Sequence, residues 1–98
     1  MNDRLRGLLG LCARAGKILS GEAICEQAIK RHTACLVLID ENASANAKKA
    51  LSDACSHYGV PLHTLPGELL GDSIGKPGRM AATITDQALA TRLANMIK

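Results

Sequence analysis

The chain has 98 residues, the length of one modest domain, so we expect a single domain over residues 1–98. With 47% hydrophobic and 21% charged residues it is typical of a folded globular protein, and with no Trp, no Phe and only Tyr58 it lacks the aromatic platforms on which folds that bind single-stranded nucleic acids stack bases. Twelve Lys and Arg residues against nine Asp and Glu leave a net charge of +3, which permits a polyanionic partner but does not require one.

The first third of the chain predicts a helix, a short strand and a second helix. The first helical stripe ends before Gly16 and consists of Leu5, Leu8, Leu9 and Cys12. Residues 17–20 are expected to be extended. The second stripe ends near His32, and we expect Ser20 and Gly21 to cap its start. Its members are Ile24, Cys25, Ala28 and Ile29.

The middle of the chain predicts a buried strand and a long helix. Residues 34–39 are six apolar residues in a row, which is typical of a central strand covered on both faces. Ser44 can cap the helix that follows, and Gly59 with Pro61 ends it. Its apolar face consists of Ala47, Ala50, Leu51, Ala54, Cys55 and Tyr58.

The last third predicts a strand over 61–65, a short helix over 67–74 and a strand over 80–84. A final helix follows, capped by Thr85 or Asp86. The order is therefore αβαβαβαβα. Helices that alternate with apolar strands predict an α/β protein with one mixed or parallel sheet between layers of helices.

Four cysteines, at positions 12, 25, 35 and 55, raise the question of a disulfide or a metal site. They hold no C-x-x-C pair, and all four fall on apolar helical stripes or in the apolar strand. We therefore expect reduced thiols that pack as small hydrophobic side chains, and no metal. The alternative is a zinc ion held by His32, Cys35, Cys55 and His57, a set whose spacing is looser than structural zinc sites usually have.

Motifs for catalysis are weak. The spans 10–17 and 71–76 each hold two glycines before a lysine, but they place five and three residues between the glycines, where the nucleotide-binding loop needs four. Asp40 and Glu41 follow the central strand, where α/β active sites often lie, yet two adjacent carboxylates are more often a solvated turn. We expect no enzyme and no cofactor.

The sequence also bears on location and assembly. It holds no apolar run of the roughly 18 residues that a membrane span needs. The charged start, followed by Arg14 and Lys17, is unlike a secretory signal. We expect a cytoplasmic protein without membrane contact and, since no heptad pattern indicates obligate assembly, a monomer.

Positive charge is concentrated in the first third of the chain. Residues 1–31 hold six basic and three acidic residues, whereas residues 32–98 hold six of each. On charge alone, an ordinary solvated helix face explains this excess better than a binding surface does.

Several segments together resemble one protein family. They are residues 8–17 (LLGLCARAGK) with Ser20 and Gly21, 35–44 (CLVLIDENAS), Lys48 and Lys49, 58–61 (YGVP), 74–76 (IGK) and 82–86 (ATITD). Over nearly its whole length the chain resembles the bacterial YlxQ-type members of the kink-turn RNA-binding ribosomal protein family, the L7Ae/L30e type. The resemblance implies a three-layer α/β/α sandwich with a four-stranded mixed sheet, and binding to structured RNA.

The resemblance also implies an altered base-reading motif. Kink-turn binders open the second helix with Gly, any residue, Asn and Glu, with a Lys three residues later. The Asn and Glu side chains read the edges of sheared G·A pairs, and the Lys contacts phosphate or guanine. Here Gly21 matches, but Ala23 and Ile24 offer no hydrogen bond to a base and Gln27 carries no charge, while Glu22 places a carboxylate earlier in the motif.

The rest of the family's RNA face is better preserved. The loop 74–79 corresponds to the loop that packs against a flipped-out nucleotide, and Asp40 with Glu41 corresponds to an acidic border of the face. The RNA-binding residues implied by the resemblance are Lys17, Ser20, Gly21, Glu22, Ala23, Ile24, Gln27, Lys30, Glu41, Ile74, Gly75, Lys76 and Arg79.

We therefore expect a non-enzymatic protein that binds structured, kink-turn-like or ribosomal RNA through an altered motif. The alternative is a ribosome-associated protein–protein interaction module that keeps the fold and has lost specific RNA recognition. Apolar Ala23 and Ile24 at an exposed helix start favour this alternative, because such a spot can mark a protein contact.

Overall fold

The computed structural model describes residues 2–97, and in this range it holds five helices and four strands in the predicted order. The helices are α1 (Asn2–Arg14), α2 (Glu22–Lys30), α3 (Ala45–Tyr58), α4 (Leu69–Ser73) and α5 (Gln87–Ile97). The strands are β1 (Ile18–Ser20), β2 (Leu36–Asp40), β3 (Leu62–Leu65) and β4 (Ala81–Ile84). None of the helices in this range is long and apolar enough to cross a membrane.

The four strands form one mixed sheet in the order β1-β4-β2-β3. Strands β2 and β3 run parallel, and β4 runs antiparallel to both of its neighbours. Ile18 pairs with Ile84 and Ser20 with Ala82, so the end of β1 lies beside the start of β4. The predicted mixed sheet is confirmed.

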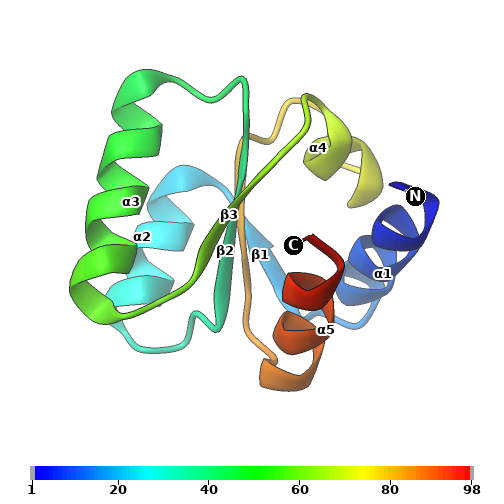
Figure 1. Ribbon diagram of the computed structural model, residues 1–98, viewed down its shortest axis with the longest axis horizontal. Helices are drawn as coiled ribbons and strands as arrows, with labels where there is room; N and C mark the ends of the chain where they lie inside the picture. Colours follow the sequence, from blue (N-terminus) through cyan, green and yellow to red (C-terminus); the bar gives the residue numbers. More distant parts are fainter. Residues whose placement is uncertain (1, 98) are drawn as a thin grey trace.

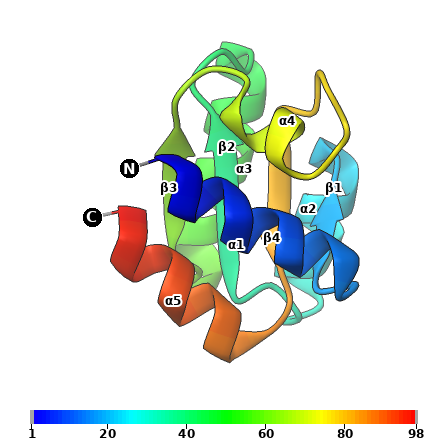
Figure 2. The ribbon, with the colours of Figure 1, turned by 90° about the vertical axis from the view of Figure 1, so that its right-hand side faces the viewer.

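Helices cover both faces of the sheet. Figures 1 and 2 show α2 and α3 on one face and α1, α4 and α5 on the other. Strand β2 contributes to both cores, because Leu36 and Leu38 pack with α1, α4 and α5 while Val37 and Ile39 pack with α2 and α3. The three-layer α/β/α sandwich implied by the resemblance is confirmed.

Most of the predicted helix caps are present. The Ser44 hydroxyl accepts a hydrogen bond at 3.1 Å from a backbone N–H of α3, and Gly59 ends α3 in the left-handed conformation. The Asp86 carboxylate caps α5 through a bond of 3.0 Å. The predicted cap of α2 is wrong in one respect: Ser20 is the last residue of β1, and Gly21, which precedes the helix, has no side chain to cap it.

The cysteines pack largely as predicted. Cys12, Cys25 and Cys55 are buried, whereas Cys35 is only partly buried because it lies just before β2, at the edge of the sheet layer. Burial raises the pKa of the Cys25 thiol to about 12, and it raises the pKa of Cys12 and Cys55 as well. Within residues 2–97 no cluster of three or more His, Cys, Asp and Glu side chains is placed to hold a metal ion.

Candidate functional site

Several of the singled-out residues meet at one end of the sheet. Strand β1 ends and α2 begins there, and the Gly21 N–H donates to the Ala81 carbonyl at 2.9 Å where β4 begins. The end of β2 is fastened to the same place, because the Asp40 N–H donates to the Met80 carbonyl at 2.8 Å. This end is the upper one in Figure 1, and the loop from α4 to β4 lies at it.

Arg79 joins that loop to the turn between β1 and α2. Its guanidinium nitrogen Nη1 donates to the Ser20 carbonyl at 3.1 Å and to the Ser20 hydroxyl at 3.3 Å. Gly21 has a φ of 114°, and a Cβ at this position would lie 3.3 Å from the same nitrogen. A guanidinium carries five N–H donors, so Arg79 keeps further donors for a ligand while it holds the turn.

The start of α2 is open to solvent. Because Gly21 supplies no capping side chain, the first N–H groups of the helix have no side-chain acceptor, and the helix dipole makes this terminus favourable for an anion. Glu22, Ala23 and Ile24 are exposed around it, with Ile24 44% exposed. Gln27 is exposed one turn farther along the helix.

The loop 74–79 has a packed base and an exposed tip. Ile74 packs against the core on the α1 side, and Lys76 is exposed. Gly75 and Gly78 have φ values of 74° and 87°, which glycine adopts without strain. Gly71 in α4 lies directly beneath the loop, since a Cβ there would be 2.8 Å from the Lys76 carbonyl oxygen.

Asp40 and Glu41 hold a loop together. The Asp40 carboxylate accepts bonds of 2.7 Å from the Asn42 and Glu68 N–H groups, and the Glu41 carboxylate accepts one of 2.6 Å from the Gly67 N–H. Asp40 is fully buried, which corrects the expectation that both residues border the face. Glu41 is exposed, but it lies on the β3 side of the sheet, two strands away from β1.

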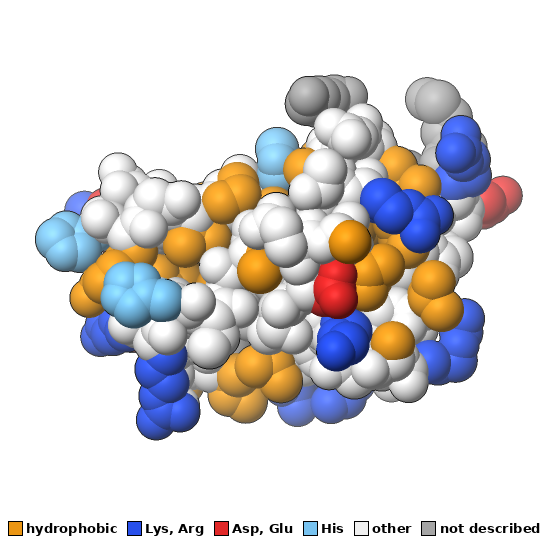
Figure 3. Space-filling view, turned by 90° about the horizontal axis from the view of Figure 1, so that it is seen from below, with side chains coloured by type: hydrophobic (Ala, Val, Ile, Leu, Met, Phe, Trp, Pro, Cys, Tyr) orange, Lys and Arg blue, Asp and Glu red, His pale blue; other side chains and the backbone are white. Residues whose placement is uncertain are grey.

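Lys17 and Lys30 lie at the opposite end of the sheet. The Lys17 carbonyl accepts a bond of 2.9 Å from the Thr85 N–H, beyond the end of β4. Lys30 is the last residue of α2, about 13 Å along the helix from Gly21. The structure therefore does not bring these two lysines together with Arg79, contrary to the single face expected from the sequence. Figure 3 shows this opposite end, with Lys and Arg side chains around its rim and hydrophobic side chains between them.

Supporting residues were missed at the sequence level. Gly71 carries a weak signal, because a glycine inside a short apolar helix indicates a close approach of another segment. Asp40 also carries a weak sequence signal, since it directly follows the apolar run of the central strand. Nothing in the sequence indicates the bond between Arg79 and Ser20, which are 59 residues apart.

Comparison with known proteins gives consistent matches over most of the chain. A model of the ribosomal protein L7Ae/L30e/S12e/Gadd45 family matches residues 3–94. The RNA-binding protein YlxQ of Bacillus subtilis is 41% identical over 91 residues, which is 92% of this chain and 91% of that protein. The RNA-binding protein YlxQ of Enterococcus faecium is 36% identical over 97 residues, 98% of this chain and 93% of that protein.

Solved structures show the same fold. A protein of unknown function from Bacillus halodurans superposes with a TM-score of 0.93 at 33% identity, over 96% of both chains. The 15.5 kDa RNA-binding protein of Giardia lamblia superposes with a TM-score of 0.80 at 26% identity, over 95% of this chain and 81% of that one.

Proposed function

The chain belongs to the ribosomal protein L7Ae/L30e/S12e/Gadd45 family, and we propose that it is a non-enzymatic, single-domain protein that binds structured RNA as a cytoplasmic monomer. Relatives of similar sequence and fold are named as RNA-binding proteins, which supports the proposal. The observation that carries it is the pair of bonds from Arg79 to Ser20, because they hold a basic loop against the open start of α2.

The proposed face has two parts with different roles. The loop 74–79 brings the positive charges of Lys76 and Arg79 to the RNA backbone, and the open N–H groups at the start of α2 add donors for a phosphate or a base edge. Ala23 and Ile24 supply no hydrogen bond to a base. We therefore expect RNA to be recognised through its shape and backbone, with strong dependence on salt.

The positions of the remaining candidates suggest a graded contribution. Residues 20–24 with Gln27 and the loop form the centre of the proposed face. Glu41 lies at its border on the β3 side, and Lys17 and Lys30 at the far end contribute only long-range attraction. The RNA class that fits recognition by shape and backbone is a kink-turn or another sharply bent segment, as found in ribosomal RNA.

The test compares two RNAs and two charge reversals. One RNA holds a kink-turn, and the other is a matched duplex with Watson–Crick pairs in place of the sheared G·A pairs. We expect a preference for the kink-turn and a loss of about tenfold in affinity for Lys76→Glu. Arg92→Glu on α5, away from the proposed face, is the matched control, while Lys98 lies outside the described residues. Equal affinity for both RNAs, with equal losses in both variants, would reduce the binding to general attraction of a polyanion.

A protein-interaction module is the second candidate, favoured by the exposure of Ile24. Co-purifying RNA discriminates between the two, because a chain with one Tyr and no Trp absorbs so weakly that bound RNA dominates the absorbance at 260 nm. A preparation without RNA that also fails to bind either test RNA would favour the protein partner.

A further inference from the structure

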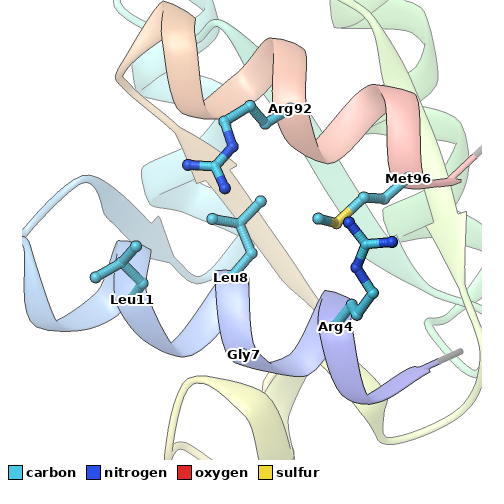
Figure 4. A pocket seen from close by; sticks show the side chains of 6 residues that line it. All are labelled: Arg4, Gly7, Leu8, Leu11, Arg92 and Met96. Carbon is cyan, nitrogen blue, oxygen red and sulfur yellow. The ribbon is translucent and has the colours of Figure 1, made fainter.

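A groove lies between α1 and α5, on the face of the sandwich that those helices form with α4. Its volume is about 310 Å³, and it is lined by Arg4, Gly7, Leu8, Leu11, Arg92 and Met96. Figure 4 shows the side chains of Leu8 and Met96 between the two helices, with the guanidinium groups of Arg4 and Arg92 beside them. Gly7 leaves the helix backbone open, since a Cβ there would meet nothing within 4 Å.

The floor of the groove is apolar and partly exposed. Leu11 is 43% exposed, although it lies in a helix whose other leucines are buried. Met96 is partly buried and packs against the same core as Leu8. A helix pair that leaves a leucine and a methionine accessible beside a glycine offers a surface for another apolar segment.

The rim of the groove is positively charged. Neither Arg4 nor Arg92 forms an ion pair with a residue between 2 and 97. Within α1 and α5, Asp3 is the single acidic residue against Arg4, Arg6, Arg14 and Arg92. The Asp86 carboxylate, just before α5, is engaged in capping that helix. Two guanidinium groups beside an apolar floor therefore have no acidic partner among the described residues.

We propose that this groove is a docking site for an acidic amphipathic helix of a partner protein. Apolar side chains at helical spacing on the partner would cover Leu8, Leu11 and Met96, and Asp or Glu beside them would pair with Arg4 and Arg92. The positive charges of Arg4 and Arg92 determine which charge the partner helix must carry and how it is oriented. The apolar contact supplies most of the affinity.

Charge and chemistry disfavour the other occupants. In a symmetric dimer the same patch meets itself, which would bring the Arg4 and Arg92 groups of both copies together. RNA fits poorly as well, because a floor of leucine and methionine offers no hydrogen bond and no aromatic ring for stacking.

The groove and the proposed RNA face are separate surfaces. Figure 2 shows α1 between α5 and α4, and the loop 74–79 lies beyond α4. A partner in the groove and an RNA at the upper end of the sheet would therefore occupy the protein together. The proposal does not depend on RNA binding, and either one can fail alone.

The test uses two synthetic helical peptides of about four turns, long enough to form a helix on a surface. Both carry the same leucine stripe, flanked by Glu in one and by Lys in the other. Binding is followed by chemical shifts of backbone amides in the full chain. We expect the Glu peptide to shift signals of α1 and α5, and to bind at least about tenfold more tightly than the Lys peptide.

Two variants and two controls sharpen the test. Reversing both charges in the Arg4→Glu/Arg92→Glu variant should switch the preference to the Lys peptide, and Leu11→Asp should weaken binding of both peptides. Leu19→Asp on β1, where Leu19 is 41% exposed, and Arg31→Glu after α2 are matched controls that should change neither affinity.

Each contrary result would overturn the proposal. A lack of preference between the peptides, or shifts outside α1 and α5, would remove the groove as their site. If the free protein dimerises and the Leu11→Asp variant does not, the groove is the interface with a second copy of the chain. Displacement of the Glu peptide by kink-turn RNA would assign it to RNA, whereas simultaneous binding would support the proposal.

Discussion

At the scale of single residues, Arg79 connects two segments of the proposed face that are distant in sequence. Its bonds to the Ser20 carbonyl and hydroxyl link the loop before β4 to the turn before α2. Lys76, three residues earlier in the same loop, is exposed and makes no side-chain hydrogen bond with a residue between 2 and 97. The two basic residues therefore differ in their effect on stability, which the sequence alone treats as equal.

Replacing Arg79 should affect both folding and binding. Arg79→Ala removes both hydrogen bonds to Ser20, so we expect a loss of about 1 kcal/mol in the free energy of unfolding. Lys76→Ala should change that free energy by no more than about 0.5 kcal/mol, as is usual for an exposed side chain. Urea unfolding measures both values. Equal stability of the two variants would show that the Arg79 bonds do not persist in solution.

The altered motif at the start of α2 gives a second prediction. Ala23, Ile24 and Gln27 are all exposed, so Asn, Glu and Lys at these positions would meet no packing obstacle. We expect the triple variant Ala23→Asn/Ile24→Glu/Gln27→Lys to gain discrimination for a kink-turn, at roughly 1–3 kcal/mol for each good base contact. Calorimetric titration with the kink-turn and the matched duplex measures it. Tight, salt-insensitive binding by the unchanged protein would show that its motif already reads bases.

At the scale of elements, α4 serves as the base of the loop 74–79. This helix has five residues, and its Gly71 lies against the backbone of the loop instead of against a side chain. The Gly71 carbonyl accepts a hydrogen bond of 2.8 Å from the Lys76 N–H. The shape of the loop thus depends on a glycine outside the loop itself.

Gly71→Ala should displace the loop. The added Cβ would lie 2.8 Å from a backbone oxygen that cannot turn aside, so we expect a cost of about 1–3 kcal/mol in stability. RNA affinity should also fall, because Lys76 and Arg79 move with the loop.

Gly7→Ala in α1 is the matched control. Open space surrounds Gly7, so alanine should stabilise the helix by roughly 0.5–1 kcal/mol and leave RNA affinity unchanged. Unfolding curves and RNA titrations of both variants check the pair. An unchanged RNA affinity in folded Gly71→Ala would remove the loop from the proposed face.

At the scale of the whole molecule, a central sheet separates two apolar cores. Cys12 belongs to the core under α1, α4 and α5, and Cys25 and Cys55 belong to the core under α2 and α3. Both cores therefore hold thiols that stay protonated because they are buried. The free energy of unfolding should reflect this at alkaline pH.

Stability should fall as the pH rises from about 9 towards 12. The folded protein keeps the Cys25 proton up to about pH 12, whereas the unfolded chain releases it near pH 9, so deprotonation favours the unfolded state in this interval. Denaturant unfolding across this range measures the slope. Cys25→Ala should show a shallower slope, because this variant lacks the thiol whose pKa burial raises to about 12. Equal slopes for the unchanged protein and Cys25→Ala would show that burial does not raise the pKa of the Cys25 thiol in the folded state.

Local patterns in the sequence are sufficient to predict most of the fold. The apolar run before Asp40 predicts a strand buried on both faces, and the structure buries every residue of β2. Ser44 and Asp86 mark the starts of α3 and α5, and Gly59 marks the end of α3, each directly beside its helix. These features depend on neighbouring residues, and side-chain periodicity reports them directly.

The composition of the candidate site was decided by the tertiary structure. Lys17 and Ser20 are three positions apart, yet β1 separates them to opposite ends of the sheet, whereas Ser20 and Arg79 are 59 residues apart and share hydrogen bonds. The hydrogen bond that the buried Asp40 accepts from the Glu68 N–H, 28 residues away, likewise depends on the tertiary structure. Helix and strand formation responds to contacts within a few residues, but strand order and register determine which distant residues meet, and those follow from packing of the whole chain.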